Sequence, residues 1–85
     1  MIKSSGSKTA SGIISAQPCK FFGATLVGSA ETSTLTIYDN AASATGTAIA
    51  ITKDSVILPI PIRCANGIYA SLTDTGNYIV YYMED

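Results

Sequence analysis

Short apolar runs separated by turn residues recur along this chain, at the spacing of about 8–12 residues that is typical of antiparallel sandwiches and barrels. The clearest run is residues 34–40. Alternation there places Leu35 and Ile37 on a core face and Tyr38 on the opposite face. The run ends at Asp39-Asn40, because such short polar side chains hydrogen-bond nearby backbone and favour turns.

The same reasoning predicts seven short strands and no helix. They are residues 9–16, 19–28, 34–40, 47–52, 55–62, 68–73 and 78–83. The alanine-rich residues 41–46 are too short for a stable helix and are interpreted as a compact loop. We therefore predict an all-β fold, a small antiparallel β-sandwich with jelly-roll or immunoglobulin-like connectivity. Residues 1–8, rich in Ser, Gly and Lys, are expected to be a flexible arm, and residues 9–85 a single domain.

The strand at 19–28 carries apolar groups on both faces. Alternation puts Phe22, Ala24 and Leu26 on one face and Phe21 on the other, so the second face is a candidate for cover by a neighbour.

Three smaller expectations concern other strands. In the strand at 47–52, Ile49 and Ile51 are expected to point inward. Gly12 suggests a bulge or a close approach of backbone. The pair Asn66-Gly67 is a strong signal for a tight turn.

Residues 55–62 contain Pro59 and Pro61, which cannot donate to a β-ladder. Such a segment is excluded from the middle of a sheet. We predict an edge strand that continues as an extended crossing between sheets. The alternative is that its apolar residues, Ile60 and Ile62 among them, form a contact surface for a partner.

Charge is sparse in this chain of 85 residues, at 13% of the residues against roughly 25% in average soluble domains. A surface of Ser, Thr, Asn and Gly explains this, and so does a surface covered by neighbouring subunits. A net charge of −1 without a basic stripe argues against nucleic acid as a partner. No apolar run is long enough for a membrane span, and residues 1–8 lack the apolar core of a signal peptide, so we expect synthesis in the cytoplasm.

Residues that could perform catalysis or hold a metal are sparse. The chain has no histidine and no serine in a Gly-x-Ser-x-Gly setting, so we predict no enzyme, no catalytic residue and no cofactor. The acidic loop residues Glu31, Asp39, Asp54 and Asp74 lack the spacing of a calcium site, and turn formation explains the three aspartates.

The two cysteines, Cys19 and Cys64, stand at the edges of apolar runs. We favour two buried thiols over a disulfide, because free cysteine behaves as a small hydrophobe and no secretory signal is present.

Tyrosine is the one residue type whose enrichment suggests a function. Three interpretations stay open: packing between strands, contact between subunits, and stacking of a ligand such as a sugar. All five tyrosines fall in predicted strands: Tyr38, Tyr69, Tyr78, Tyr81 and Tyr82. The predicted interface residues are Tyr38, Tyr69, Ile60, Ile62 and Tyr81.

Two segments and the tyrosine-rich last strand carry a resemblance to a known group of proteins. Residues 34–48 read Thr-Leu-Thr-Ile-Tyr-Asp-Asn-Ala-Ala-Ser-Ala-Thr-Gly-Thr-Ala, and residues 61–70 read Pro-Ile-Arg-Cys-Ala-Asn-Gly-Ile-Tyr-Ala. Together they resemble small virion proteins of tailed phages, namely head decoration or cement proteins and related components. The resemblance covers roughly residues 20–83 and contains no catalytic motif.

The resemblance implies a β-sandwich with a structural role on the capsid surface of a virion. The implied partners are the major capsid protein and further copies of the chain, for which we expect a homo-oligomer, most plausibly a trimer at a threefold position. The alternative is a module of a tail or fibre that binds a glycan or a receptor.

Overall fold

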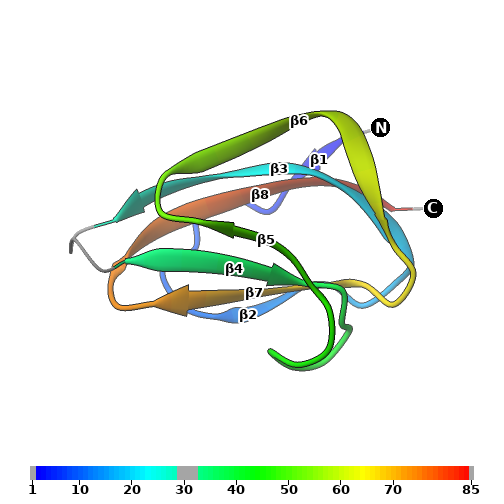
Figure 1. The fold of residues 1–85 in the computed structure, drawn as a ribbon, viewed down its shortest axis with the longest axis horizontal. Coiled ribbons are helices and arrows are strands. Elements are labelled where there is room, and N and C mark those ends of the chain that lie inside the picture. The colour runs from blue at the N-terminus through cyan, green and yellow to red at the C-terminus, as the bar shows by residue number, and fades with distance from the viewer. Residues whose placement is uncertain (1, 29–32, 85) are drawn as a thin grey trace.

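The computed structural model describes residues 2–28 and 33–84, which form two four-stranded antiparallel sheets packed face to face (Figure 1). The predicted β-sandwich is confirmed, with eight strands instead of seven. They are β1 (Lys3–Ser4), β2 (Gly12–Ser15), β3 (Cys19–Gly28), β4 (Thr34–Tyr38), β5 (Ala48–Thr52), β6 (Ser55–Cys64), β7 (Ile68–Thr73) and β8 (Gly76–Glu84). The additional strand is β1, which lies inside the segment predicted as a flexible arm.

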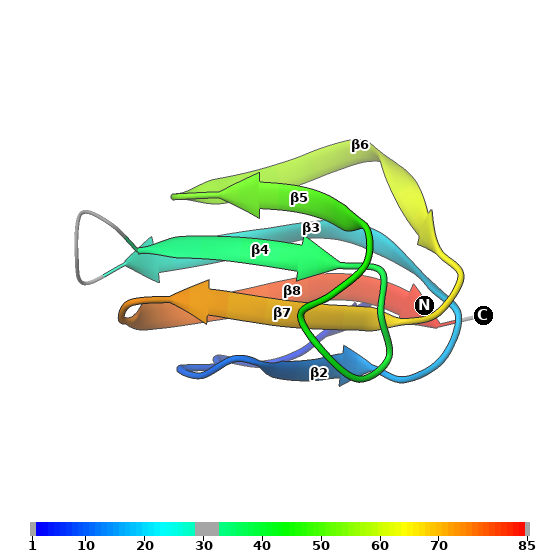
Figure 2. The same ribbon diagram turned by 60° about the horizontal axis from the view of Figure 1, so that its bottom comes forward.

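The chain is one long antiparallel hairpin rolled into two sheets. Strand β1 pairs with β8, β2 with β7, β3 with β6 and β4 with β5, so each strand meets its counterpart from the other half of the chain. The strand orders are β1-β8-β3-β6 in sheet A and β2-β7-β4-β5 in sheet B. This is the connectivity of a jelly roll, which decides between the two connectivities left open by the sequence. Figure 2 shows sheet B in front, with the loop between β4 and β5 as the tip of the rolled hairpin.

The core lies between the inner faces of the two sheets. Leu35 and Ile37 are fully buried, which confirms their prediction as core residues. Alternation in β7 is also as expected, because Ile68 and Ala70 are buried and Leu72 packs against the core. The remaining buried apolar residues are Cys19, Phe21, Ala24, Leu26, Cys64, Tyr78 and Val80.

A β-bulge in β3 changes which phenylalanine is buried. The register against both neighbouring strands shifts between Phe21 and Gly23. Phe21 therefore shares the core face with Ala24 and Leu26, whereas Phe22 points away from it. The simple alternation, which grouped Phe22 with Ala24 and Leu26, is wrong, because one extra residue reverses the face.

The expectation that Ile51 points inward is also wrong. Its neighbour Ala50 pairs with the core residue Ile37, so Ile51 lies on the outer face and is 68% exposed. The register against β4 shifts between Ile37 and Tyr38, and Ile49 packs against the core as expected.

Gly12 is not a close approach of backbone, since a methyl group there would meet no atom within 4 Å. The irregularity in β2 comes just after it, between Ile13 and Ser15.

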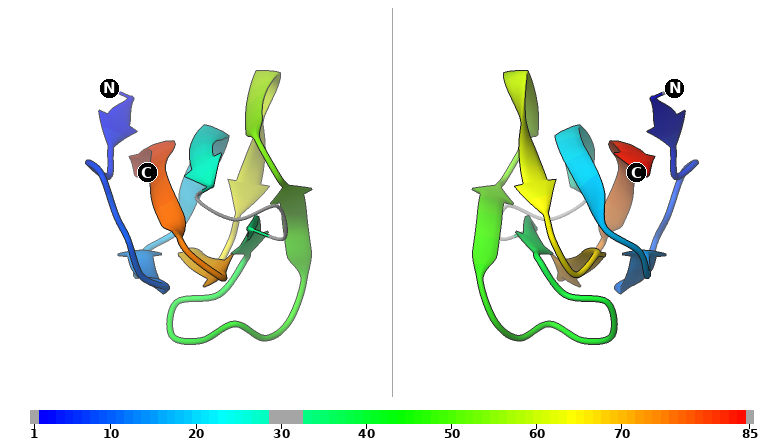
Figure 3. Two further views of the ribbon diagram at one scale, coloured as in Figure 1. Left: turned by 90° about the vertical axis from the view of Figure 1, so that its left-hand side faces the viewer. Right: turned by 90° about the vertical axis from the view of Figure 1, so that its right-hand side faces the viewer.

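The four sheet edges each carry a feature that discourages strand addition. Strand β6 is the edge of sheet A, as predicted, and it contains two prolines. The opposite edge, β1, has two residues. In sheet B, both β2 and β5 are short and interrupted by register shifts. Figure 3 shows β1 and β2 along one side of the sandwich and β5 and β6 along the other.

The N-terminal segment runs along the edge of β8. Ser5 N donates to Val80 O at 2.9 Å, and Lys8 pairs with Tyr78 through two backbone hydrogen bonds. Lys3 Nζ donates to Glu84 Oε1 at 2.7 Å. Glu84 also accepts a hydrogen bond from Ser15 Oγ at 2.9 Å, which links the end of sheet A to sheet B.

The predicted loop at residues 41–46 is confirmed as a loop. Asn40 Oδ1 accepts hydrogen bonds from the backbone N–H groups of Ala42 and Ser43. Asp39 Oδ1 accepts from Asn66 N at 2.9 Å, so this carboxylate joins two loops at one end of the sandwich. Asp39 and Asn40 therefore have the structural role that turn chemistry assigns them.

Candidate functional site: an apolar groove

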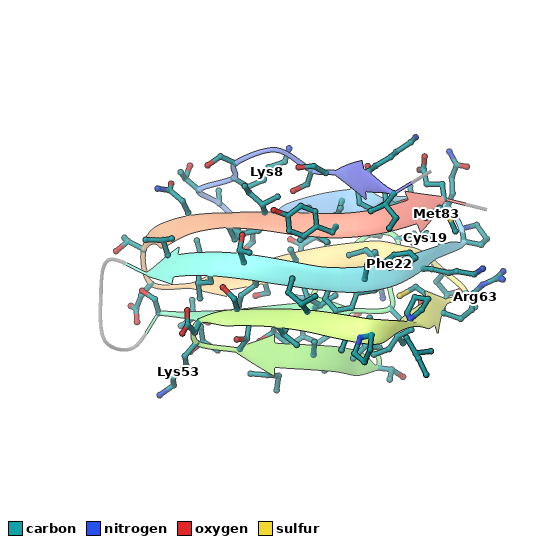
Figure 4. All side chains as sticks on the ribbon, turned by 90° about the horizontal axis from the view of Figure 1, so that it is seen from above. Lys8, Cys19, Phe22, Lys53, Arg63 and Met83 are labelled. Atoms are coloured by element: carbon teal, nitrogen blue, oxygen red, sulfur yellow. The ribbon has the colours of Figure 1, made fainter. Side chains whose placement is uncertain are left out.

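The outer face of sheet A carries a groove of about 380 Å³. It is lined by Ile2, Phe22, Ile57, Leu58 and Tyr81, which come from the N-terminal segment, β3, β6 and β8. Figure 4 views this face and shows Phe22 on β3, between β8 and β6. We call this set of five residues the groove.

The bulge at Gly23 creates the groove. Gly23 is the register partner of Ile57 on one side and of Tyr81 on the other. These three residues form a row of side chains across the sheet. Because glycine has no side chain, the row has a gap between Ile57 and Tyr81. The same bulge turns Phe22 outward beside the gap. A Cβ at Gly23 would lie 2.4 Å from Val56 O, and its φ of 148° is unfavourable for other residues, so the position requires glycine.

Large aliphatic side chains are exposed in the groove and beside it. Ile57 is 67% exposed and Ile2 is 54% exposed. Ile60, two residues beyond Leu58 on β6, is 77% exposed. Burying apolar surface of this kind gains roughly 25 cal/mol per Å², and contiguous apolar patches mark interaction sites. A groove lined by no charged residue is suited to receive an apolar side chain of a partner.

The five predicted interface residues do not form one surface. Tyr81 lines the groove, and Ile60 lies on the same strand as Ile57. Ile62 is partly buried against the core. Tyr38 and Tyr69 belong to sheet B, on the far side of the sandwich.

Tyr38 and Tyr69 are direct cross-strand partners in β4 and β7. Their chain neighbours Ile37 and Ile68 are fully buried, so both tyrosines stand on the outer face of sheet B. Ile13 on β2 is the next partner of Tyr69 in the same row. This arrangement is the one expected for packing between strands, and it also presents two adjacent aromatic rings to the outside.

Tyr78 has a structural environment. Its side chain is buried, and its hydroxyl donates to Ala10 O at 2.7 Å. Burial, and then the nearby Tyr69, raise the pKa of this phenol. A second hollow of about 370 Å³ lies beside it, between residues 7–14 and β8.

The chemistry-bearing residues are dispersed. Among residues 2–28 and 33–84, no three of the His, Cys, Asp and Glu side chains gather where they could hold one metal ion. Glu31, one of the four acidic loop residues considered from the sequence, lies outside the described residues. Cys19 and Cys64 are thiols not joined by a disulfide, and their predicted burial is confirmed.

Of the five groove residues, only Tyr81 is among the predicted interface residues. Ile57 and Leu58 belong to the apolar run 55–62, whose alternative interpretation was a contact surface, and Ile2 and Phe22 were not identified. The available signal was Gly23, because an isolated glycine inside a strand is a mark of a bulge. The same rule marks Gly12, where the structure shows no close approach of backbone. With a bulge at Gly23, alternation would have placed Phe22 on the outside.

The chain was compared with models of protein families, with curated proteins and with solved structures, and none of the three comparisons returned a match. The part of the chain that the structure describes contains no helix with the length and apolarity needed to cross a membrane.

Proposed function

We propose that this chain is a structural protein of a tailed-phage virion, a decoration or cement protein that binds the head lattice. The observation that carries the proposal is the groove, which exposes apolar side chains on the outside of a small sandwich. The resemblance of residues 34–48 and 61–70 to such virion proteins gives the class of partner. Jelly rolls occur in viral capsid proteins, which is compatible with this role.

In this proposal the chain binds through a sheet face and not through an edge. Prolines, short strands and register shifts discourage a partner strand from adding to the sheets. The groove instead receives an apolar side chain of the major capsid protein. Each contact is small, but a lattice repeats it many times, and an oligomer that engages several sites gains avidity.

The proposed assembly is a closed homo-oligomer, most simply a trimer at a threefold position of the lattice. Its stabilising effect on the shell follows from linkage, since a protein that binds the intact lattice and not the disrupted one shifts the equilibrium toward the lattice. Native mass spectrometry of the purified protein tests the oligomer in solution, and electron microscopy of the decorated capsid tests it on the particle. A protein that is monomeric in both would contradict the trimer.

The proposed function is tested with capsids of the phage that encodes this chain, assembled without it. Purified protein is added in increasing amounts and the capsids are sedimented. We expect binding that saturates at a fixed number of copies per capsid, together with a higher temperature of capsid disruption. Protein that stays in the supernatant at all concentrations would overturn the proposal.

Recognition of a glycan is the second candidate, and the Tyr38–Tyr69 pair is the observation in its favour. Two adjacent outward rings can stack on a sugar, and jelly rolls also occur in lectins. A glycan array probed with the wild type and with Tyr38→Ala distinguishes the two functions. Glycan binding that Tyr38→Ala abolishes supports this candidate, and an array without any bound glycan removes it.

A further inference from the structure

We propose that Cys19 and Cys64 are a latent intramolecular disulfide site, two thiols in the reduced protein that a disulfide oxidant joins. The two residues are register partners in the antiparallel β3–β6 pair, at the first residue of β3 and the last of β6. Both are thiols not joined by a disulfide, and both are fully buried. The inference goes beyond the proposed function and stands independently of it.

The strand geometry places the thiols within bridging range. Directly opposed residues of antiparallel strands have Cα atoms about 4.5 or 5.5 Å apart, according to the kind of pair. Disulfides span Cα separations of about 4.4–6.8 Å, so either kind of pair can be bridged. Both side chains also point to the same face of sheet A, the inner one.

The folded environment holds the Cys64 sulfur in the thiol form. Burial first, and then the neighbouring Cys19, raise the pKa of Cys64 from its ordinary value of 9.0 to about 12. The Cys64 Sγ donates to Ile62 O at 3.8 Å. Since the thiolate is the nucleophile, oxidation is slow until the end of β6 opens and admits water and oxidant.

The reaction balances with glutathione disulfide as the oxidant. One cysteine thiolate attacks a sulfur of glutathione disulfide, which forms a mixed disulfide and releases one glutathione thiolate. The second cysteine thiolate then attacks the protein sulfur of that mixed disulfide and releases the second glutathione. The protein loses two protons and two electrons, and one glutathione disulfide becomes two glutathione thiols.

The bridge would fasten the edge strand of sheet A. Strand β6 carries the groove residues Ile57 and Leu58, and it is held in sheet A by β3 alone. The bond would also close a loop from β3 to β6, through the tip of the rolled hairpin, in the unfolded chain. Restricting the unfolded chain in this way stabilises the folded state. The inside of a cell keeps such a pair reduced, whereas an oxidising medium outside it favours the bond.

The test uses the wild-type protein and glutathione disulfide. The protein is incubated with the oxidant, and free thiols are then alkylated under denaturing conditions and counted by intact-mass spectrometry. We expect one product, a monomer about 2 Da lighter that accepts no alkyl group. Its urea midpoint should be higher than that of the reduced protein, and dithiothreitol should reverse both changes. Low concentrations of urea should accelerate the reaction.

Single-cysteine variants provide the matched controls. Cys19→Ser and Cys64→Ser each retain one thiol, so neither can form the bridge, and each should show a glutathione adduct or no reaction. The proposal is overturned if the wild type accumulates glutathione adducts or intermolecular disulfides in place of the internal bridge. It is equally overturned if the bridged protein has a lower urea midpoint than the reduced one.

Discussion

At the scale of single residues, Gly23 shapes the outer face of sheet A. It accommodates the bulge, brings Ile57 and Tyr81 to either side of a gap, and turns Phe22 outward. The sequence shows the glycine, but it does not show that the strand bulges there and turns Phe22 outward. Whether a strand glycine bulges depends on the neighbouring strands, which alternation within one strand does not describe.

Replacing Gly23 with alanine should destabilise the protein severely. The new methyl group would lie 2.4 Å from Val56 O, and the backbone would keep a φ of 148°. We expect a loss of more than about 2 kcal/mol in the free energy of unfolding, measured by urea titration. Gly12→Ala is the control, because a methyl group there meets nothing within 4 Å. Equal stability losses in the two variants would contradict this account of the bulge.

The raised pKa of Cys64 predicts a loss of stability in alkaline solution. The folded protein holds this proton up to about pH 12, whereas an unfolded thiol releases it near 9.0. The stabilising contribution is therefore complete below pH 9 and is lost as the pH rises toward 12. Urea midpoints between pH 8 and 11 should fall less steeply in Cys64→Ala than in the wild type. Parallel declines in both proteins would assign the alkaline loss to other groups, such as Tyr78.

At the scale of elements, the positions of most strands in the sequence were predictable. Which of their side chains face the core was predictable only in part. The runs around Leu35 and around Ile68 alternate without interruption, and their core faces follow from the sequence. In β3 and β5 a register shift falls inside the strand, which misplaces Phe22 and Ile51. Strand β1 was missed because two polar residues give no periodic signal. It exists through hydrogen bonds to the distant β8.

The attachment of β1 to the sandwich should depend on Glu84. Its carboxylate accepts hydrogen bonds from Lys3 Nζ and from Ser15 Oγ, and both lower its pKa, Lys3 more strongly. Glu84→Gln removes the charge, so amide hydrogen exchange at Ser5 should become faster. Exchange at Lys8, whose N–H donates to Tyr78 O at 2.8 Å, should change less.

Acid provides a second measurement of the same contact. A carboxylate with a lowered folded pKa contributes stability above its ordinary pKa of 4.5, and this contribution is lost as the pH falls. Wild-type exchange at Ser5, corrected for the intrinsic effect of pH, should therefore approach that of Glu84→Gln in acid. A Ser5 amide that is indifferent to both changes would show that β1 is held by its backbone alone.

At the scale of the whole molecule, the rolled hairpin separates two exterior surfaces. The all-β sandwich could be predicted because short strands and turns recur along the chain. The jelly-roll strand order could not be predicted, because it depends on which strands pair although they lie far apart in the sequence. The same limit applies to the site. Tyr38 was predicted to face outward and Tyr81 to lie in an interface, but only the strand order assigns them to opposite sheets.

The proposal that the groove on sheet A is the docking surface is tested by a matched pair of variants. Ile57 and Ile51 are 67% and 68% exposed, but Ile57 lines the groove whereas Ile51 lies on sheet B. Both side chains are largely in solvent, so a charge at either position should leave the folded protein intact, which circular dichroism verifies.

The measurement is sedimentation of Ile57→Glu and Ile51→Glu with capsids that lack this protein. A buried carboxylate without a partner opposes docking strongly, so Ile57→Glu should lose at least about tenfold in affinity. Ile51→Glu should bind as the wild type does. Unchanged binding of Ile57→Glu, or a loss confined to Ile51→Glu, would contradict the account and move the docking surface away from sheet A.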